Sequence, residues 1–252
     1  MSERSSREAR QTGAVPRFEL EAWRRDFGIV AGITGRGEAA EPFDLGLWSQ
    51  TPVTTAMGRW RSFRNSIPGF DACILGMQVH GTRVKWHENP SGWLLLEGAD
   101  GHATGSAGVL LTVTVADCVP VYLIDPEARR VALLHTGWRG TAAGMLRAGI
   151  EMLRSHGSAP SSVLMHCGVA ICGRCYEVGS EVFGALDLPL PGAEGRGLLD
   201  LRAVLERQGR DLGVSRVSTS DRCSAHDATD FFSHRASRGA DGRMVAYLGV
   251  LP

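Results

Sequence analysis

VLLTVTVADCVPVYLIDPEARRVALLHTGWRG, residues 109–140, carries three consecutive strand signals, and the rest of the fold is predicted around it. Three runs of β-branched and other apolar residues, at 109–115, 119–124 and 130–134, predict three strands. Asp125-Pro126 predicts a turn between the last two runs. We therefore expect these two strands to form a hairpin in which Ile124 lies opposite Val131.

Cys118 and His135 stand at the ends of the two hairpin strands, each beside a turn sequence. In the predicted register they are diagonal neighbours on one face, with Cα atoms about 7–8 Å apart by general sheet geometry. Across that separation a cysteine and a histidine side chain can converge on one ion. His80 offers a third ligand, because it ends an apolar strand expected over 73–79 and precedes a glycine.

Two imidazoles and one thiolate with an open fourth position are typical of catalytic zinc, whereas structural zinc is closed by four protein ligands. The residue types leave a second interpretation open, because a buried cysteine often only packs and an isolated histidine often only forms structural hydrogen bonds. A third interpretation needs no metal, with Cys118 as a nucleophile and His135 as its base.

The remaining patterns predict an α+β fold, with mixed sheets and helices outside them. Further strands are expected at 83–86 and near 163–166 and 244–250, and a glycine-rich loop over 92–105. One helix is expected from Thr141 through about Ser155, and another near 200–211. Residues 1–16 are polar and arginine-rich, so we expect a disordered tail followed by a single domain over 17–252.

The charge composition excludes several classes of function. Lys+Arg and Asp+Glu both number 27, so no global field attracts nucleic acid or an anionic membrane. Lys85 is the single lysine, and its context lacks the Gly-Lys-Ser/Thr step of a P-loop. Any bound phosphate must therefore be held by arginine, backbone N–H groups or a metal. Without a signal peptide among residues 1–16, we expect a cytoplasmic protein with reduced or metal-bound thiols.

Six cysteines are present, and Cys118 is the one to which we assign a role. Cys172-Gly-Arg-Cys175 has the spacing of a metal or redox pair, with Cys167 nearby. Because no second Cys-x-x-Cys accompanies it, we interpret this pair as incidental.

Seven segments resemble, in order and approximate spacing, the polyphenol oxidase/laccase-domain family, which includes multicopper polyphenol oxidase-like and purine nucleoside phosphorylase-type proteins. They are QVHGTRV (78–84), GADGHAT (98–104), TVADCVPVYLIDP (114–126), HTGWRGTAAGML (135–146), YEVGSEV (176–182), DRCS (221–224) and FFSHR (231–235). The resemblance implies a four-layer α/β/β/α fold. It also implies that His80, Cys118 and His135 bind zinc and form the catalytic centre.

The same resemblance implies a purine nucleoside phosphorylase with adenosine deaminase and methylthioadenosine phosphorylase activities. Its substrates would be a purine nucleoside and phosphate, and we expect neither nucleic-acid nor membrane partners. The expected substrate-binding residues are Arg59, Gln78, Asp100, Arg139 and Arg235. Asp100 is also a candidate for orienting a ligand histidine. The sequence departs from the family pattern at Asp44, Gly58 and Ala236, which leaves the substrate preference open.

Other function classes stay open at this stage. A copper-dependent polyphenol oxidase is one, since three N/S ligands also bind copper, but the eight histidines contain no His-x-His pair. A metal-free Cys-His hydrolase acting on an amide, such as a cell-wall precursor, is another. A non-enzymatic, degenerate member of the family is a third, because of the altered positions. The oligomeric state is not predicted.

Overall fold

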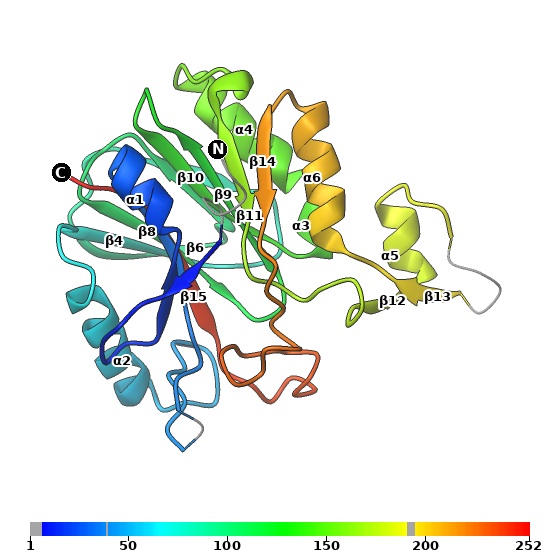
Figure 1. Ribbon diagram of the computed structural model, residues 1–252, viewed down its shortest axis with the longest axis horizontal. Helices are drawn as coiled ribbons and strands as arrows, with labels where there is room; N and C mark the ends of the chain where they lie inside the picture. The colour runs from blue at the N-terminus through cyan, green and yellow to red at the C-terminus, as the bar shows by residue number, and fades with distance from the viewer. Residues whose placement is uncertain (1–6, 39, 191–194) are drawn as a thin grey trace.

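The computed structural model describes residues 7–38, 40–190 and 195–252, and its body is built from two stacked mixed β-sheets with helices outside both (Figure 1). The first sheet has the strand order β1-β2-β3-β15-β8-β4-β6. Its strands are β1 (Ala9–Arg10), β2 (Arg17–Glu19), β3 (Ile29–Thr34), β15 (Met244–Val250), β8 (Val109–Val115), β4 (Ala72–Met77) and β6 (Gly92–Glu97).

The second sheet has the order β14-β11-β9-β10-β7-β5. Its strands are β14 (Arg216–Thr219), β11 (Leu164–Cys167), β9 (Val119–Asp125), β10 (Arg130–Thr136), β7 (Gly101–Thr104) and β5 (Val84–His87). A separate antiparallel pair, β12 (Glu177–Gly179) and β13 (Arg196–Leu198), lies with α5 to one side of the layered body (Figure 1).

The helices are α1 (Glu21–Phe27), α2 (Val53–Asn65), α3 (Trp138–Ala142), α4 (Met145–Ser155), α5 (Ser180–Ala185) and α6 (Leu201–Asp211), and a 3₁₀ turn covers Pro160–Ser162. Asp200 begins α6, where its carboxylate accepts a hydrogen bond from the Arg202 backbone N–H at 3.0 Å. Within the described part of the chain, no helix is long and apolar enough to cross a membrane.

The hairpin forms in the predicted register. Ile124 pairs with Val131, and His135 pairs with Pro120, which leaves Cys118 diagonal to His135 just before β9 begins. The locally encoded turn explains this agreement, because a short connection between two strands sets their pairing. Both hairpin strands are interior strands of the second sheet, between β11 and β7.

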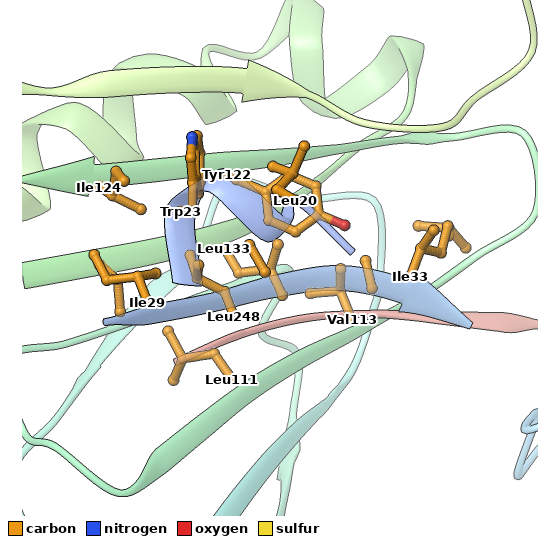
Figure 2. Packing of buried hydrophobic residues seen from close by; sticks show 14 of the residues in the cluster. Leu20, Trp23, Ile29, Ile33, Leu111, Val113, Tyr122, Ile124, Leu133 and Leu248 are labelled. Atoms are coloured by element: carbon orange, nitrogen blue, oxygen red, sulfur yellow. The ribbon is translucent and has the colours of Figure 1, made fainter. Parts of the chain in front are cut away.

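Alternation along the strands creates four layers. Val131 and Leu133 of β10 face the first sheet, while Ala132 and Leu134 face α4 on the other side. Figure 2 shows the layer between the sheets, where Leu111 and Leu248 of the first sheet meet Leu133 of the second. On the outer face of the first sheet, Trp60 and Phe63 of α2 are fully buried. The predicted α/β/β/α arrangement is therefore confirmed.

Two predictions about helices and loops need correction. The helix expected from Thr141 to Ser155 is two helices, because Gly144 adopts φ 91°, a left-handed conformation that ends α3 before α4 begins. The expected loop over 92–105 contains two strands, β6, which pairs with β4, and β7, which pairs with β10. Their glycines lie within strands or tight turns, and a glycine count alone does not distinguish these from a loop.

The predicted tail over 1–16 is wrong at its C-terminal end. Ala9 and Arg10 pair with β2, and the Glu8 side chain is buried. Its carboxylate contacts the His166 ring at 3.0 Å and accepts a hydrogen bond from Ser220. A polar segment is ordered here because it meets buried polar partners, which hydropathy does not predict. Residues 1–6 lie outside the described residues.

Candidate metal centre

His80, Cys118 and His135 converge in one cluster, in which each contributes a ligand atom within 4.8 Å of the others. Cys118 precedes β9 and His135 lies near the end of β10, so the hairpin register brings these two together. His80 comes from the segment after β4 in the other sheet. The His80 and His135 rings lie edge to face, with centroids 4.9 Å apart. The cluster therefore joins the two sheets at one end of the hairpin.

The backbone is strained at two points of this cluster. His80 has φ 59°, and Asp117, directly before Cys118, has φ 79°. Non-glycine residues rarely adopt this left-handed region, and where they do the surrounding structure must hold them there. At Asp117 the carboxylate accepts hydrogen bonds from the Ser224 hydroxyl and the Arg235 backbone N–H, both at 2.6 Å. These contacts hold the turn that presents Cys118.

Asp100 holds the other turn together. One carboxylate oxygen accepts hydrogen bonds from the His80 backbone N–H and the His135 ring Nδ1, both at 2.9 Å. The second oxygen accepts from the backbone N–H groups of Val79 and Gly81, both at 3.0 Å. Its side chain has no exposed surface. Both carboxylate oxygens are thus occupied by donors from the protein, and these contacts fit the alternative role of Asp100, orienting a ligand histidine, rather than substrate binding.

The charges of Cys118 and His135 stabilise each other. Burial opposes ionisation of the Cys118 thiol, but the neighbouring His135 and His80 outweigh it and lower the pKa to about 6. Burial also opposes protonation of His135, while Cys118 and Asp100 raise its pKa to about 9. The pocket therefore favours the thiolate, the form of cysteine that binds metals and attacks electrophiles.

The three residues fit a metal ion with an open position. Since His135 uses Nδ1 on Asp100, Nε2 is the nitrogen that would bind a metal in place of its proton, an arrangement common for metal-bound histidine. Gly137 leaves the required space, because a Cβ there would lie 3.0 Å from Cys118 Sγ and 3.1 Å from His80 Cδ2. His80 is exposed and Cys118 is partly exposed, so one side of the cluster faces solvent. Three N/S ligands and an open side are typical of catalytic zinc.

Two of the five predicted substrate-binding residues lie beside this open side. The Arg235 guanidinium lies 5.1 Å from the centre of the Tyr176 ring and donates to the Glu177 carbonyl at 2.8 Å. Arg139 is exposed and stacks on Trp138 at 4.4 Å. Burial raises the pKa of the Tyr176 hydroxyl to about 12, with contributions from Cys118 and Asp117 that Arg235 and Arg139 oppose. The Arg235 backbone contacts Asp117, and Arg139 follows Gly137 by two residues, so both arginines belong to the segments that surround Cys118.

Tyr176 lies against Arg235 and is not among the predicted site residues. In the sequence it is the first residue of the YEVGSEV segment. Its position directly after the Cys172–Cys175 turn was the available signal.

Gln78 and Arg59, two of the expected substrate-binding residues, make contacts away from the metal cluster. Gln78 extends the sheet, since its side-chain amide donates to the Thr114 carbonyl and accepts from the Thr114 N–H, both at 2.8 Å. It therefore positions the segment that leads to His80. Arg59 lines a separate cavity of about 700 Å³ together with Thr114, and none of the three metal-site residues lines it.

Asp44, one of the departures from the family pattern, organises a wall of that cavity. Its carboxylate accepts hydrogen bonds from Gly46 N–H and Arg243 N–H at 2.8 and 2.7 Å, and from the Ser49 and Thr51 hydroxyls. Burial alone would raise its pKa, but these hydrogen bonds outweigh burial and lower it. Asp44 therefore acts as a loop-building residue, with its charge already satisfied by the protein.

The chain is similar to proteins of known family over most of its length. A family model described as "Multi-copper polyphenol oxidoreductase laccase" matches residues 41–251. In sequence alignment the chain is 35% identical to "Purine nucleoside phosphorylase YlmD" of Geobacillus stearothermophilus, covering 88% of this chain and 90% of that protein. It is 38% identical to "Purine nucleoside phosphorylase" of Deinococcus radiodurans, covering 69% and 68% respectively.

Solved structures agree with this assignment. The crystal structure of YlmD from Geobacillus stearothermophilus matches with a TM-score of 0.88 and 30% identity over the structural alignment, covering 97% of this chain and 100% of that one. The Bacillus licheniformis hypothetical protein YfiH matches with a TM-score of 0.86 and 26% identity, covering 93% and 96%. With its fold and nearly all of its motif-bearing sequence matched, the chain belongs to the multi-copper polyphenol oxidoreductase laccase family.

Proposed function

We propose that this protein is a zinc-dependent purine nucleoside phosphorylase that uses His80, Cys118 and His135 as its metal ligands. The observation that carries the proposal is the three-ligand cluster with an open side, and Arg139 and Arg235 belong to segments that contact it. The relatives named purine nucleoside phosphorylase supply the substrate class. Adenosine deaminase and methylthioadenosine phosphorylase activities are part of the same proposal.

The donor set favours zinc over copper. One thiolate and two imidazoles bind either metal, but zinc with three protein ligands leaves a position for water or substrate. The sequence has no His-x-His pair of the kind that a multicopper oxidase uses. Copper-dependent phenol oxidation therefore stays the less favoured activity of this site.

The residues around the centre have distinct tasks in phosphorolysis. A bound zinc would supply a Lewis acid that polarises a substrate oxygen. Arg139 and Arg235 would bind phosphate through charge-assisted hydrogen bonds and hold it beside the nucleoside. A phosphate oxygen then forms a bond to C1′ while the bond from C1′ to the purine nitrogen breaks, and the leaving purine takes up a proton. The products are ribose 1-phosphate and the free base.

Deamination would use the same pocket with water in place of phosphate. The water oxygen bonds to C6 of adenine, the C6 amine leaves as ammonia, and adenosine becomes inosine. Asp100 keeps His135 in the tautomer with Nε2 free, and the carboxylate of Asp117 holds the turn before Cys118. These two residues position the centre without touching substrate.

Product analysis tests the proposal. Zinc-loaded protein is incubated with adenosine or inosine, with and without phosphate, and the bases and nucleosides are separated by chromatography. We expect phosphate-dependent hypoxanthine from inosine, and its loss in His80→Ala. His156→Ala is the matched control, because His156 stacks on Trp86 at 3.6 Å and is not a member of the cluster. The proposal would be rejected if adenosine yielded neither adenine nor inosine and inosine yielded no hypoxanthine, with or without phosphate.

A metal-free hydrolase is the second candidate, because Cys118, His135 and Asp100 have the order of a Cys-His-Asp triad. Removal of metal by a chelator separates the two candidates. The zinc enzyme loses activity and regains it on adding zinc. A cysteine hydrolase keeps amide-cleaving activity without metal and loses it on alkylation of Cys118.

A further inference from the structure

A second cluster of metal-binding side chains lies outside the centre described above. Cys172, Cys175, Cys223 and His226 each contribute a ligand atom within 4.8 Å of all the others. Cys172 Sγ lies 3.4 Å from His226 Nδ1, and Cys175 Sγ lies 3.4 Å from His226 Nε2. The Cys172-x-x-Cys175 pair, interpreted as incidental from the sequence, therefore lies against a second pair, the Cys-x-x-His pair at 223–226.

The backbone brings the two pairs together in a defined way. In the first loop, the backbone N–H groups of Cys175 and Tyr176 both donate to the Cys172 carbonyl, at 2.9 and 3.1 Å, which folds the loop into a tight turn. A parallel bridge joins Ala170 to Cys223. The loops are thus aligned directly next to the cysteines, and four ligands from two chain segments meet.

Hydrogen bonds fix the position of Cys223 on both sides. The Cys172 backbone N–H points at Cys223 Sγ at 3.3 Å, which is an N–H···S contact typical of metal-bound thiolates. The Cys223 N–H in turn donates to the Asp227 carboxylate at 3.1 Å, and the Arg222 side chain donates to the same oxygen at 3.3 Å. Cys223 is buried, while Cys172 and Cys175 are partly buried.

We propose that these four residues bind a structural zinc ion. Three thiolates and one imidazole form a closed tetrahedral set for zinc, with no position left for substrate. Three thiolates gathered this closely repel one another unless a cation lies between them, and zinc is the common divalent ion that prefers such soft ligands. The site differs in kind from the His80 cluster, which has a single thiolate and an open side.

The ion would fasten the loop that supports the catalytic turn. Ser224, next to Cys223, donates to Asp117, and the Ile171 N–H, next to Cys172, donates to the Asp117 carbonyl at 3.1 Å. Both halves of the zinc site are therefore one residue away from a contact with Asp117, which precedes Cys118. Loss of this zinc is expected to loosen the turn at Cys118 and the attached Arg235.

The number of zinc ions per chain, measured by inductively coupled plasma mass spectrometry, tests the proposal. Protein purified under reducing conditions is expected to hold two zinc ions per chain, and one in Cys175→Ser. His226→Asn is a milder second variant, since its exposed side chain leaves all three thiols in place. It is expected to lose the same ion to a chelator at least tenfold faster than wild type. Arg174→Ser, which alters the same turn without removing a ligand, is the matched control and should keep both ions.

Cobalt substitution gives a second readout that does not depend on activity. In the Co²⁺ protein, the thiolate-to-cobalt charge-transfer absorption should fall strongly in Cys175→Ser and only slightly in Cys118→Ser. The reason is that the proposed site holds three of the four cysteine ligands in the two clusters. Circular dichroism checks that each variant is folded. One zinc in wild type with no change in Cys175→Ser would overturn the proposal. A Cys172–Cys175 disulfide that persists in protein purified with a reductant and zinc would also overturn the proposal, and would indicate a redox pair.

Discussion

Asp100→Asn is the substitution that tests most directly how the centre is held. The Asp100 carboxylate accepts four hydrogen bonds from Val79, His80, Gly81 and His135. An asparagine offers one acceptor oxygen in place of two, so two of these donors, which point at the fully buried Asp100 side chain, lose their acceptor. At roughly 1–3 kcal/mol for each unsatisfied donor, we expect the free energy of unfolding to fall by about 2–6 kcal/mol.

The effect on the metal follows from the direction of the new amide. If its nitrogen faces His135, then Nδ1 of His135 must accept, and the ring proton moves to Nε2, which is the atom needed for zinc. If the nitrogen faces the other way, it opposes the N–H groups of Val79 and Gly81 and displaces His80. Both outcomes weaken binding, and loss of such an orienting group typically lowers zinc affinity about 10–100-fold.

Competition with a chromophoric chelator measures the affinity, and urea unfolding of the zinc-free protein measures stability. Asp125→Asn is the matched control, because Asp125 is also buried and accepts from Ala128 and Ser162 at the opposite end of the hairpin. It should lose stability and keep its zinc affinity. If Asp100→Asn lowers zinc affinity no more than Asp125→Asn does, the orienting role is refuted. A wild-type protein that binds no zinc would refute the metal centre itself.

Three further predictions use other parts of the molecule. Burial is the main cause that lowers the pKa of His102 to about 3, so its neutral form contributes stability that is complete above pH 6.5 and is lost as the pH falls. Between pH 6.5 and pH 5 His102 should account for about 2 kcal/mol of the stability lost in urea unfolding, and a His102→Leu variant with an unchanged slope would contradict this. Gly137→Ala places a methyl group against Cys118 and should lower zinc affinity about tenfold, while Gly58→Ala, with no atom within 4 Å of its new Cβ, should leave it unchanged. Arg235→Ala should raise the KM for phosphate about 10–100-fold in steady-state assays, and an equal rise in the exposed-residue control Arg61→Ala would exclude a specific phosphate contact.

Local patterns predicted the hairpin and, with it, two of the three proposed metal ligands, Cys118 and His135. The pairing of Ile124 with Val131 depends on two β-rich runs and an Asp-Pro turn within a few residues of each other. Cys118 and His135 inherit their proximity from that register. The same local reasoning failed at Gly144, where one left-handed residue divides an otherwise continuous helical pattern.

Long-range contacts were beyond reach of these patterns. A sequence pattern records which positions are buried and how nearby segments pair, but it does not record which distant loops meet. Asp100 is an example, since the sequence left a substrate contact and an orienting role both open, and its four hydrogen bonds depend on the packing of the two sheets. Arg59 is another, because its helix lies on the outer side of the first sheet, where it borders a different cavity.

By itself, the sequence determined the strand-rich mixed fold, the hairpin that pairs Cys118 with His135, and the need for arginine, backbone or metal to hold any phosphate. The tertiary structure decided that His80 from the other sheet completes the centre, and that the pair at Cys172 and Cys175 has a partner in Cys223 and His226. The physical reason is separation along the chain. Turn chemistry and side-chain alternation act over a few residues, whereas both clusters form where whole strands and sheets have brought distant loops together.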